Sequence, residues 1–445
     1  MAEKAAQSRN RLKHATHILW LATCALVLSP GLTQAQTPAQ PPLQTNAGIP
    51  TPTSSPDALT LQQLIDIAQN RNPSILAARQ NLEAVRAQEV QAGVRVNPYF
   101  TAAGSNVTLP AEGASNPYSY SGQVSRLFER GEKRRWRLDI ARATTEQTAD
   151  QLRDQQRQVI FALKQAFTNM LMAKAALMLA QDNLKDFRHE VDINNERFKA
   201  GDIDELDFKR LDLQLAQFES DEANAKSNLA QASYQVQTLA GYSHVDDIFD
   251  IRGDIFPPVV NDNLTSLEQK ALATRPDYLA AQAGTRVANA NVKLADANGT
   301  TDPTLEGEYD RSGTDNSAGF SINIPLRIFD RNQGNKETSR YQATASQFAV
   351  TAAENQVRSD VAQAWVGYTT SKALSDRYNS HYLDESRQAL SIAQFAYEHG
   401  GIALIDYLDA LRDARTVAVN ALSAYAQTWL AIHQLSLTTA TEVVP

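Results

Sequence analysis

The chain contains one cysteine, Cys24, in 445 residues. Disulfide bonds within one chain are therefore excluded, as are metal sites built from several thiolates. Aromatic residues make up 7% of the sequence, and charged residues 21%. Beyond the N-terminal segment no run of 18 apolar residues occurs, so the sequence predicts no membrane-spanning helix.

Motifs for chemistry are also absent. The sequence has no G-x-x-x-x-G-K-[ST] loop, so any energy from nucleotide hydrolysis must come from a partner protein. It has no nucleophile elbow or zinc-hydrolase motif, and no cluster of histidines with metal-ligand spacing. We therefore predict that the protein is not an enzyme and has no cofactor and no metal site. The formal net charge of −8 argues against a nucleic-acid partner.

Residues 1–35 have the pattern of a secretory signal peptide. A basic start is followed by an apolar core at 18–28 and by small residues around Ala35. Cys24 lies inside this core, where it is either a lipidation site or an ordinary signal-core residue. Residues 36–58 are rich in Pro, Thr and Gln, which predicts a disordered linker.

The rest of the chain reads as a tandem duplication. Leu61, Leu64, Ala68 and Pro73 recur 203 positions later as Leu264, Leu267, Ala271 and Pro276. We predict a first structural repeat at 59–260, a second at 261–438 and a tail at 439–445. Each repeat is expected to hold short helices, a strand hairpin and a long helical hairpin.

Strands are predicted at 99–107 and 118–128 in the first repeat, and at 304–310 and 320–326 in the second. Their apolar and polar residues alternate, most clearly in Phe320-Ser-Ile322-Asn-Ile324. This pattern fits either an outer-membrane β-barrel or a soluble hairpin, and the signal peptide and long helices favour the barrel. Gly131 and Gly334 follow the two hairpins and are expected to allow a sharp strand-to-helix turn. The basic cluster Lys133, Arg134, Arg135 and Arg137 either meets lipid phosphates or is a solvated helix start.

Long helical hairpins are predicted at 132–240 and 336–437. Apolar residues from Val159 to Val191 are spaced alternately by four and three, which is the period of a coiled coil. The corresponding seam from Val357 to Tyr382 is more polar, which suggests a helix pair that lines water. Four strands cannot close a barrel, whereas three copies supply about twelve. The predicted fold is thus mainly helical, with four strands per protomer of a trimeric barrel.

The hairpin tips are the candidate functional site. Gly201 marks the first tip, and Gly400 and Gly401 mark the second; Phe198 and Asp207 correspond to Tyr397 and Asp406. Asp406 and Asp409 share one helix face, so a trimer would carry rings of carboxylates that attract cations. Alternatively, these aspartates only favour a helix N-terminus through its dipole. His399 is either part of a cation site or simply exposed.

Taken in order, these features resemble the TolC-like outer membrane efflux family over residues 59–437. The segment from Pro325 to Gly334 is most similar to the heavy-metal cation-efflux (CzcC-type) branch. The resemblance implies a homotrimer in the outer membrane that extends into the periplasm. It also implies contact with outer membrane lipid, a periplasmic adaptor (membrane fusion) protein and an inner-membrane pump of the RND or ABC type.

The resemblance further assigns a pore gate to Tyr397, Asp406, Asp409 and Asp207. Where family members carry an arginine that ties this gate shut, the present chain has Ile402. The predicted function is a passive outer-membrane efflux channel, with metal cations among its candidate substrates. The alternatives are the outer-membrane component of type I protein secretion and a non-channel periplasmic coiled-coil scaffold.

Overall fold

The computed structural model describes residues 49, 54–105, 118–244 and 249–444. The predicted signal peptide with Cys24, linker residues 36–48 and 50–53, and the loop of the first strand hairpin lie outside the described residues. The elements follow one another as α1 (Leu61–Arg71), α2 (Pro73–Gly93), β1 (Tyr99–Ser105), β2 (Ser119–Leu127), α3 (Lys133–Ala200), α4 (Glu205–Ala240), α5 (Leu264–Thr274), α6 (Pro276–Asn298), β3 (Thr304–Ser312), β4 (Asp315–Asn323), α7 (Gln333–Arg377), the π-helix η1 (Tyr378–Tyr382), α8 (Leu383–Glu398) and α9 (Leu404–Thr439).

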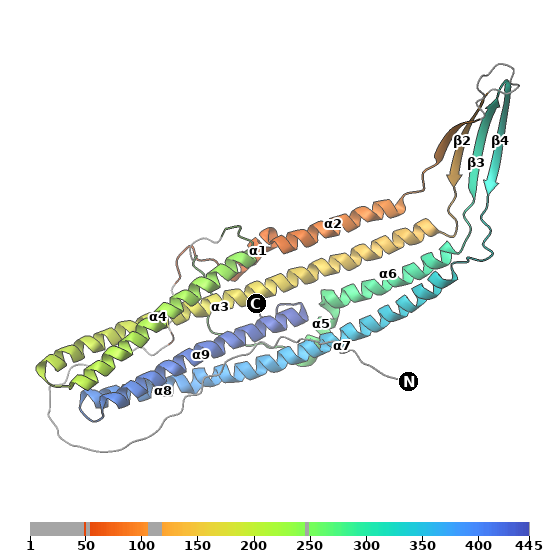
Figure 1. Ribbon diagram of the computed structural model, residues 1–445. Helices are drawn as coiled ribbons and strands as arrows, with labels where there is room; N and C mark the ends of the chain where they lie inside the picture. Colours follow the sequence, from red (N-terminus) through yellow and green to blue (C-terminus); the bar gives the residue numbers. More distant parts are fainter. Residues whose placement is uncertain (1–48, 50–53, 106–117, 245–248, 445) are drawn as a thin grey trace, which may run out of the picture.

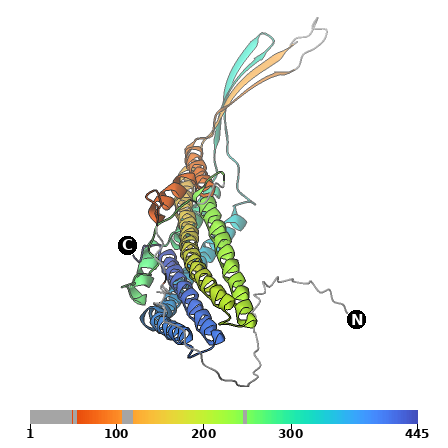
Figure 2. The same ribbon diagram turned by 90° about the vertical axis from the view of Figure 1, so that its left-hand side faces the viewer.

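The molecule is a long helical bundle with a sheet at one end. Helices α2, α3, α6 and α7 run side by side toward the sheet, while the α3–α4 and α8–α9 tips lie at the opposite end (Figure 1). Figure 2 shows the same separation from a second direction. The order of elements before residue 241 recurs after it, which shows the predicted duplication. No helix in the described ranges is long and apolar enough to span a membrane.

Local signals explain where the short helices begin. The Thr60 hydroxyl accepts the backbone N–H of Gln63 at 3.3 Å, while the Gln63 side chain accepts the backbone N–H of Thr60 at 2.9 Å. This reciprocal pair is a capping box. Asn72 then ends α1 and caps α2, whose first residue is Pro73. Proline is favoured at this position because the N–H that it lacks would have no helical partner there.

The four strands form one antiparallel sheet in the order β1-β2-β3-β4. Every residue of β1 and β4 is exposed in the protomer, including Phe100 at 72% and Phe320 at 83%. β1 and β4 are the two edges and have no further partner strand among the described residues. The sheet therefore presents open hydrogen-bonding edges and apolar side chains that the helices do not cover.

The second strand hairpin differs from its predicted bounds. Residues 311–319 were expected to form a loop, yet Ser312 pairs with Asp315 and only two residues separate the strands. Gly313, at φ +61°, supplies the left-handed conformation that a tight hairpin requires. The polar residues around the turn suggested a longer loop, although they occupy strand positions. β4 consequently ends at Asn323, three residues before the predicted end.

Gly334 does not make the second strand-to-helix turn. It lies within the first turn of α7, and the left-handed residue is Asn332, at φ +61°. In the first repeat, Gly131 (φ +72°) and Glu132 (φ +58°) share that conformation. A Cβ on Gly131 would also lie 2.6 Å from the Thr300 hydroxyl oxygen. Glycine is thus required at residue 131, whereas an asparagine, which tolerates this conformation, suffices at residue 332.

The apolar core consists of three clusters spaced along the bundle. One joins α1, α3, α4 and α9 around Leu163 and Tyr425. A second joins α5, α7 and α9 around Val361 and Ile432. The third holds the two hairpin tips together. The predicted α3 seam supplies buried residues to the first and third clusters, among them Met170 and Phe187.

The polarity of the α7 seam suggested that it lines water, but within the protomer the seam is buried. Val357, Val361, Ala364 and Tyr368 are all buried beneath α5 and α9. The hydroxyl of Tyr368 accepts the backbone N–H of Val260 at 2.8 Å, which satisfies its polar group in the core. A tyrosine in a helix seam is therefore compatible with a dry interface when its hydroxyl reaches a partner.

The π-helix η1 breaks this seam. The period predicted Tyr378 and Tyr382 on the buried face, but Tyr382 is 42% exposed and Leu383 is buried instead. A π-turn contains one extra residue, so the buried face shifts by one position after it. Leu390 and Tyr397 continue the shifted face toward the tip. No residue pattern in the sequence marks this insertion.

Candidate functional site at the hairpin tips

The first tip turns at Gly201. Its φ of +85° is left-handed, and its N–H donates to the carbonyl oxygen of Phe198 at 3.0 Å. No atom lies within 4 Å of a Cβ placed on Gly201, so the backbone conformation rather than space requires glycine. Asp204 then caps α4 by accepting the backbone N–H of Asp207 at 2.8 Å.

The second tip uses two glycines for different reasons. Gly400 is left-handed at φ +73°. A Cβ on Gly401 would lie 3.3 Å from the carbonyl oxygen of Ala396, which is tighter than ordinary contact. The carboxylate of Asp406 accepts the backbone N–H of Ala403 at 3.2 Å, where α9 begins. Asp406 thus acts at this helix start, as one of the two interpretations of the sequence anticipated.

The other two predicted gate carboxylates are ion-paired within their own helices. Asp207 lies 3.0 Å from the Arg210 guanidinium, and Asp409 lies 2.7 Å from that of Arg412. Asp406 is exposed and has no basic partner among the described residues. The three acids at the tips therefore stand beside two arginines, which reduces the negative charge that they present.

Tyr397 is buried and joins the two hairpins. Its hydroxyl donates to the side-chain oxygen of Asn194 on α3 at 3.0 Å. Its ring stacks on Tyr407 of α9, with centroids 5.3 Å apart and planes at 4°. Burial raises the pKa of both phenols, so each remains protonated at neutral pH. Tyr397 thus joins the two hairpins as an uncharged phenol.

Arg197 is the second α3 residue in this contact. Its guanidinium carbon lies 5.7 Å from the centre of the Tyr397 ring, and Nη1 lies 3.5 Å from the Tyr397 hydroxyl oxygen. Nη1 is also 3.4 Å from the side-chain oxygen of Asn194. Ile402, at the position where the family resemblance implied an arginine, is partly buried against the apolar cluster of the tips. The guanidinium near Tyr397 therefore comes from the other hairpin.

Asn194 and Arg197 were not among the predicted site residues. A signal for Asn194 was present, because the α3 seam of Leu184, Phe187 and Val191 reaches Asn194 after its next step of three. A polar residue on such a seam indicates a specific partner. The Asn194 amide also donates to Glu190 at 2.8 Å. Burial raises the pKa of Glu190 above its ordinary value.

A second link joins the hairpins farther from the tips. Arg415 of α9 forms a 2.8 Å ion pair with Asp221 of α4. The same guanidinium lies over the ring of Phe218, 4.8 Å from its centre. Phe218 stacks in turn on Phe187 of α3. The two hairpins are thus connected by the Tyr397 contact at the tip and by the Arg415 contact between their long helices.

His399 lies at the surface of the second tip. It is exposed, and its Nδ1 lies 2.8 Å from the carbonyl oxygen of Phe395. Within the described ranges no group of three or more His, Cys, Asp or Glu side chains is arranged to hold a metal ion. The exposed interpretation of this histidine therefore agrees with its geometry.

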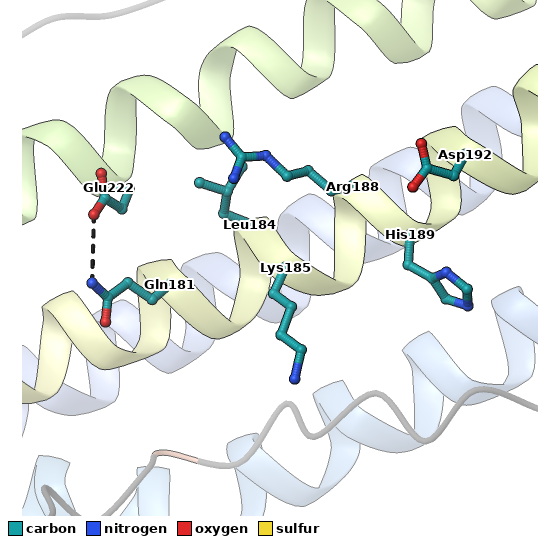
Figure 3. A pocket seen from close by; sticks show the side chains of 7 residues that line it. All are labelled: Gln181, Leu184, Lys185, Arg188, His189, Asp192 and Glu222. Atoms are coloured by element: carbon teal, nitrogen blue, oxygen red, sulfur yellow. Dashed lines mark hydrogen bonds between the residues drawn. The ribbon is translucent and has the colours of Figure 1, made fainter.

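A polar pocket opens between α3 and α4 above the first tip. Its volume is about 490 Å³, and it is lined by Gln181, Leu184, Lys185, Arg188, His189, Asp192 and Glu222. The Gln181 amide donates to Glu222 across the pocket at 3.4 Å. Figure 3 shows Lys185 and His189 pointing away from α4. The pocket is thus lined by charged groups of both signs.

Comparisons with known proteins agree with this architecture. The family model described as "Outer membrane efflux protein" matches residues 64–242 and 267–441, one segment in each repeat. The chain is 24% identical over 382 residues to the cobalt-zinc-cadmium resistance protein CzcC of Cupriavidus metallidurans, which covers 85% of this chain and 90% of that protein. It is 23% identical over 262 residues to the cation efflux system protein CusC of Escherichia coli, at 56% of each. A crystal structure of CusC superposes with a TM-score of 0.72 and 19% identity, covering 85% of this chain and 91% of that one.

Proposed function

The chain belongs to the outer membrane efflux protein family, and from this premise we propose that it is the outer-membrane duct of a tripartite efflux system. The protein is an outer membrane channel and not an enzyme. The non-channel scaffold considered from the sequence is thereby excluded. The long helical hairpin of each repeat falls within the family match, and this observation carries the proposal.

The proposed duct is a homotrimer. The open edges of β1 and β4 and the exposed apolar side chains of both edge strands support this assembly. Three such sheets joined edge to edge supply twelve strands for a closed barrel and leave no unpaired edge. Residues that are exposed in one protomer, such as Phe100 and Phe320, would then face lipid or a neighbouring protomer.

The duct is passive, and its partners supply the energy. We propose that an inner-membrane pump of the RND or ABC type delivers substrate, and that a periplasmic adaptor connects the pump to the tips. The polar pocket between α3 and α4 is the proposed adaptor contact, because it lies near the tips and carries both Arg188 and Glu222. Charges of both signs suit a specific contact with a polar helical partner.

Metal cations are the proposed substrates. CzcC is named for resistance to cobalt, zinc and cadmium, and CusC for cation efflux. The proposed gate at the tips consists of Tyr397 with Asp207, Asp406 and Asp409, whose carboxylates favour cations over anions. The experiment is to delete the protein from cells that retain the pump and adaptor, and to measure Zn²⁺, Co²⁺ and Cd²⁺ accumulation.

We expect the deletion strain to accumulate these metals and to recover when the protein is restored. Metal levels that do not change, together with loss of secretion of a protein substrate, would favour type I secretion instead. The purified protein should also conduct ions in planar bilayers. Absence of conductance would contradict the duct itself, independently of its substrate.

A further inference from the structure

The segments that join the sheet to the helices are unusually basic. We use the term junction for residues 94–98, 128–137, 299–303 and 324–336, which are the four connections together with the first turns of α3 and α7. The junction contains nine lysines and arginines but four acidic residues, in a chain whose formal net charge is −8. Figure 1 shows these connections together at one level between sheet and bundle.

Most of the acidic residues in the junction are already paired. The Lys133 ammonium is buried and lies 2.5 Å from Asp302, and Arg135 lies 3.1 Å from Glu132. The guanidinium of Arg137 holds Glu129 through two hydrogen bonds. Three of the four basic residues first considered as lipid contacts are thus engaged within the protomer.

Four exposed arginines remain, and within the described residues no acidic side chain forms an ion pair with the guanidinium group of any of them; the Asp302 carboxylate accepts only the backbone N–H of Arg130, at 2.8 Å. They are Arg95, Arg130, Arg134 and Arg331, from three of the four connections. Asp330, the remaining acid, accepts the backbone N–H of Asn332 at 2.8 Å. These unpaired guanidinium groups give the junction a positive electrostatic potential that attracts anions.

Apolar side chains lie at the same level as these arginines. Phe329 is 89% exposed, Leu326 is 78% exposed and Phe128 is 43% exposed. Trp136 lies in the first turn of α3, and Arg135 is placed over its ring at 5.1 Å. Arginines interleaved with exposed aromatic and aliphatic groups suit a boundary between water and a lipid layer. A free phosphate ion would use the arginines but not the apolar groups.

We propose that Arg130, Arg134 and Arg331 bind the phosphate headgroups of anionic phospholipids at the membrane surface nearest the helices. The planar guanidinium donates two parallel hydrogen bonds to phosphate oxygens, and the neighbouring Phe329 and Leu326 contact the acyl chains. This inference rests on the proposed membrane position of the sheet. It assigns a preferred lipid class to the junction, in addition to the function of the duct.

The test measures quenching of Trp136 fluorescence by brominated lipids. The mature protein, without the predicted signal peptide and its Trp20, is reconstituted in phosphatidylcholine with a small fraction of brominated phosphatidylglycerol or, in parallel, of brominated phosphatidylcholine. Trp136 is the only tryptophan in the junction, while Trp365 and Trp429 lie within the bundle. Each arginine near an anionic surface contributes about a fivefold preference, so we expect the anionic quencher to be at least that much more effective.

The variant combines Arg130→Gln, Arg134→Gln and Arg331→Gln, and should lose this preference. A matched control combines Arg252→Gln and Arg377→Gln, which are exposed arginines outside the junction, and should retain it. Equal quenching by the two lipids in the unmodified protein would overturn the proposal, as would a preference that survives in the triple variant. Binding of inorganic phosphate to the detergent-solubilised protein, together with equal quenching by the two lipids, would identify a site for free anions. That result would also overturn the proposal. Conductance is measured on the same samples. If the unmodified protein does not conduct ions, the proposed duct fails, whereas the lipid preference is decided by quenching alone.

Discussion

The hydroxyl of Tyr397 donates a hydrogen bond to the side-chain oxygen of Asn194 at 3.0 Å, across 203 residues of sequence. This bond joins α8 of the second hairpin to α3 of the first, and both residues are buried. If the tips form the mouth of the proposed duct, widening of that mouth requires the tips to move. A buried contact between the two hairpins of one protomer resists that movement.

We expect Tyr397→Phe to weaken the closed tip. The change removes one hydrogen bond worth about 1 kcal/mol but keeps the ring that stacks on Tyr407. In planar bilayers the variant should open more often or at lower voltage than the unmodified channel. Tyr234→Phe, an exposed tyrosine of α4, is the control and should behave like the parent. Identical gating of all three proteins would show that this contact does not hold the mouth closed.

Cation selectivity should depend on the arginines beside the predicted gate acids. Two of the three predicted gate carboxylates are ion-paired with arginines, so the contribution of these three acids to selectivity in the unmodified duct should be modest. Arg412→Gln removes the charge beside Asp409 and should raise cation selectivity. Asp406→Asn should lower selectivity while its side-chain oxygen still accepts the Ala403 N–H. Reversal potentials in a salt gradient measure both changes, with Arg377→Gln as the control. Unchanged potentials in both variants would place these residues outside the ion path.

The fold could largely be predicted from the sequence, because its signals are local and repeated. Thr60 and Asn72 cap helices, and the apolar period of α3 marks its buried seam. The duplicated order of motifs then predicts the arrangement of both halves. Patterns of this kind are reliable because each depends on neighbours within a few residues.

Some of the features that were missed depend on contacts between distant residues, and others are local. Asn194 and Arg197 reach Tyr397 only after the two hairpins pack together, so nothing near Arg197 in the sequence indicates its role. The ion pairs of Asp207 and Asp409 were within reach of sequence analysis, since Arg210 and Arg412 follow at i+3. The extra residue of η1 had no such signal, because its helix looks continuous in sequence.

The π-helix should be dispensable once its extra residue is removed. Deletion of Ser380 would leave a regular helix, in which Leu383 takes the position that the period of the α7 seam assigns to the buried face. Leu383, Leu390 and Tyr397 should then remain in the core of the tip. We therefore expect the deletion variant to have a melting temperature close to that of Ser380→Ala, which changes only an exposed side chain and is the matched control. A deletion variant that melts far below this control, or whose tip becomes open to limited proteolysis, would show that the π-helix itself is needed for the packing of α8.

The stability of the protein should fall in acid because of His433. This residue is 5% exposed, and its Nε2 lies 3.0 Å from the hydroxyl oxygen of Thr168. Burial, with a smaller contribution from the charge of Lys164, lowers the pKa of His433 from 6.5 to about 4. The unfolded chain therefore binds a proton at a higher pH than the folded protein does. Stability associated with this residue is present above pH 6.5 and is lost as the pH falls from 6.5 toward 4.

The full loss amounts to about 3 kcal/mol, which follows from a difference of between two and three pKa units. His433→Gln does not titrate and retains an amide that can hydrogen-bond Thr168, so its melting temperature should fall less steeply over the same pH range. His399→Gln is the control, because His399 is exposed at the tip. Melting temperatures of the detergent-solubilised protein across this range measure the effect. If the unmodified protein and His433→Gln lose stability in parallel, other groups must cause the acid sensitivity, and the buried imidazole is not the one that titrates on unfolding.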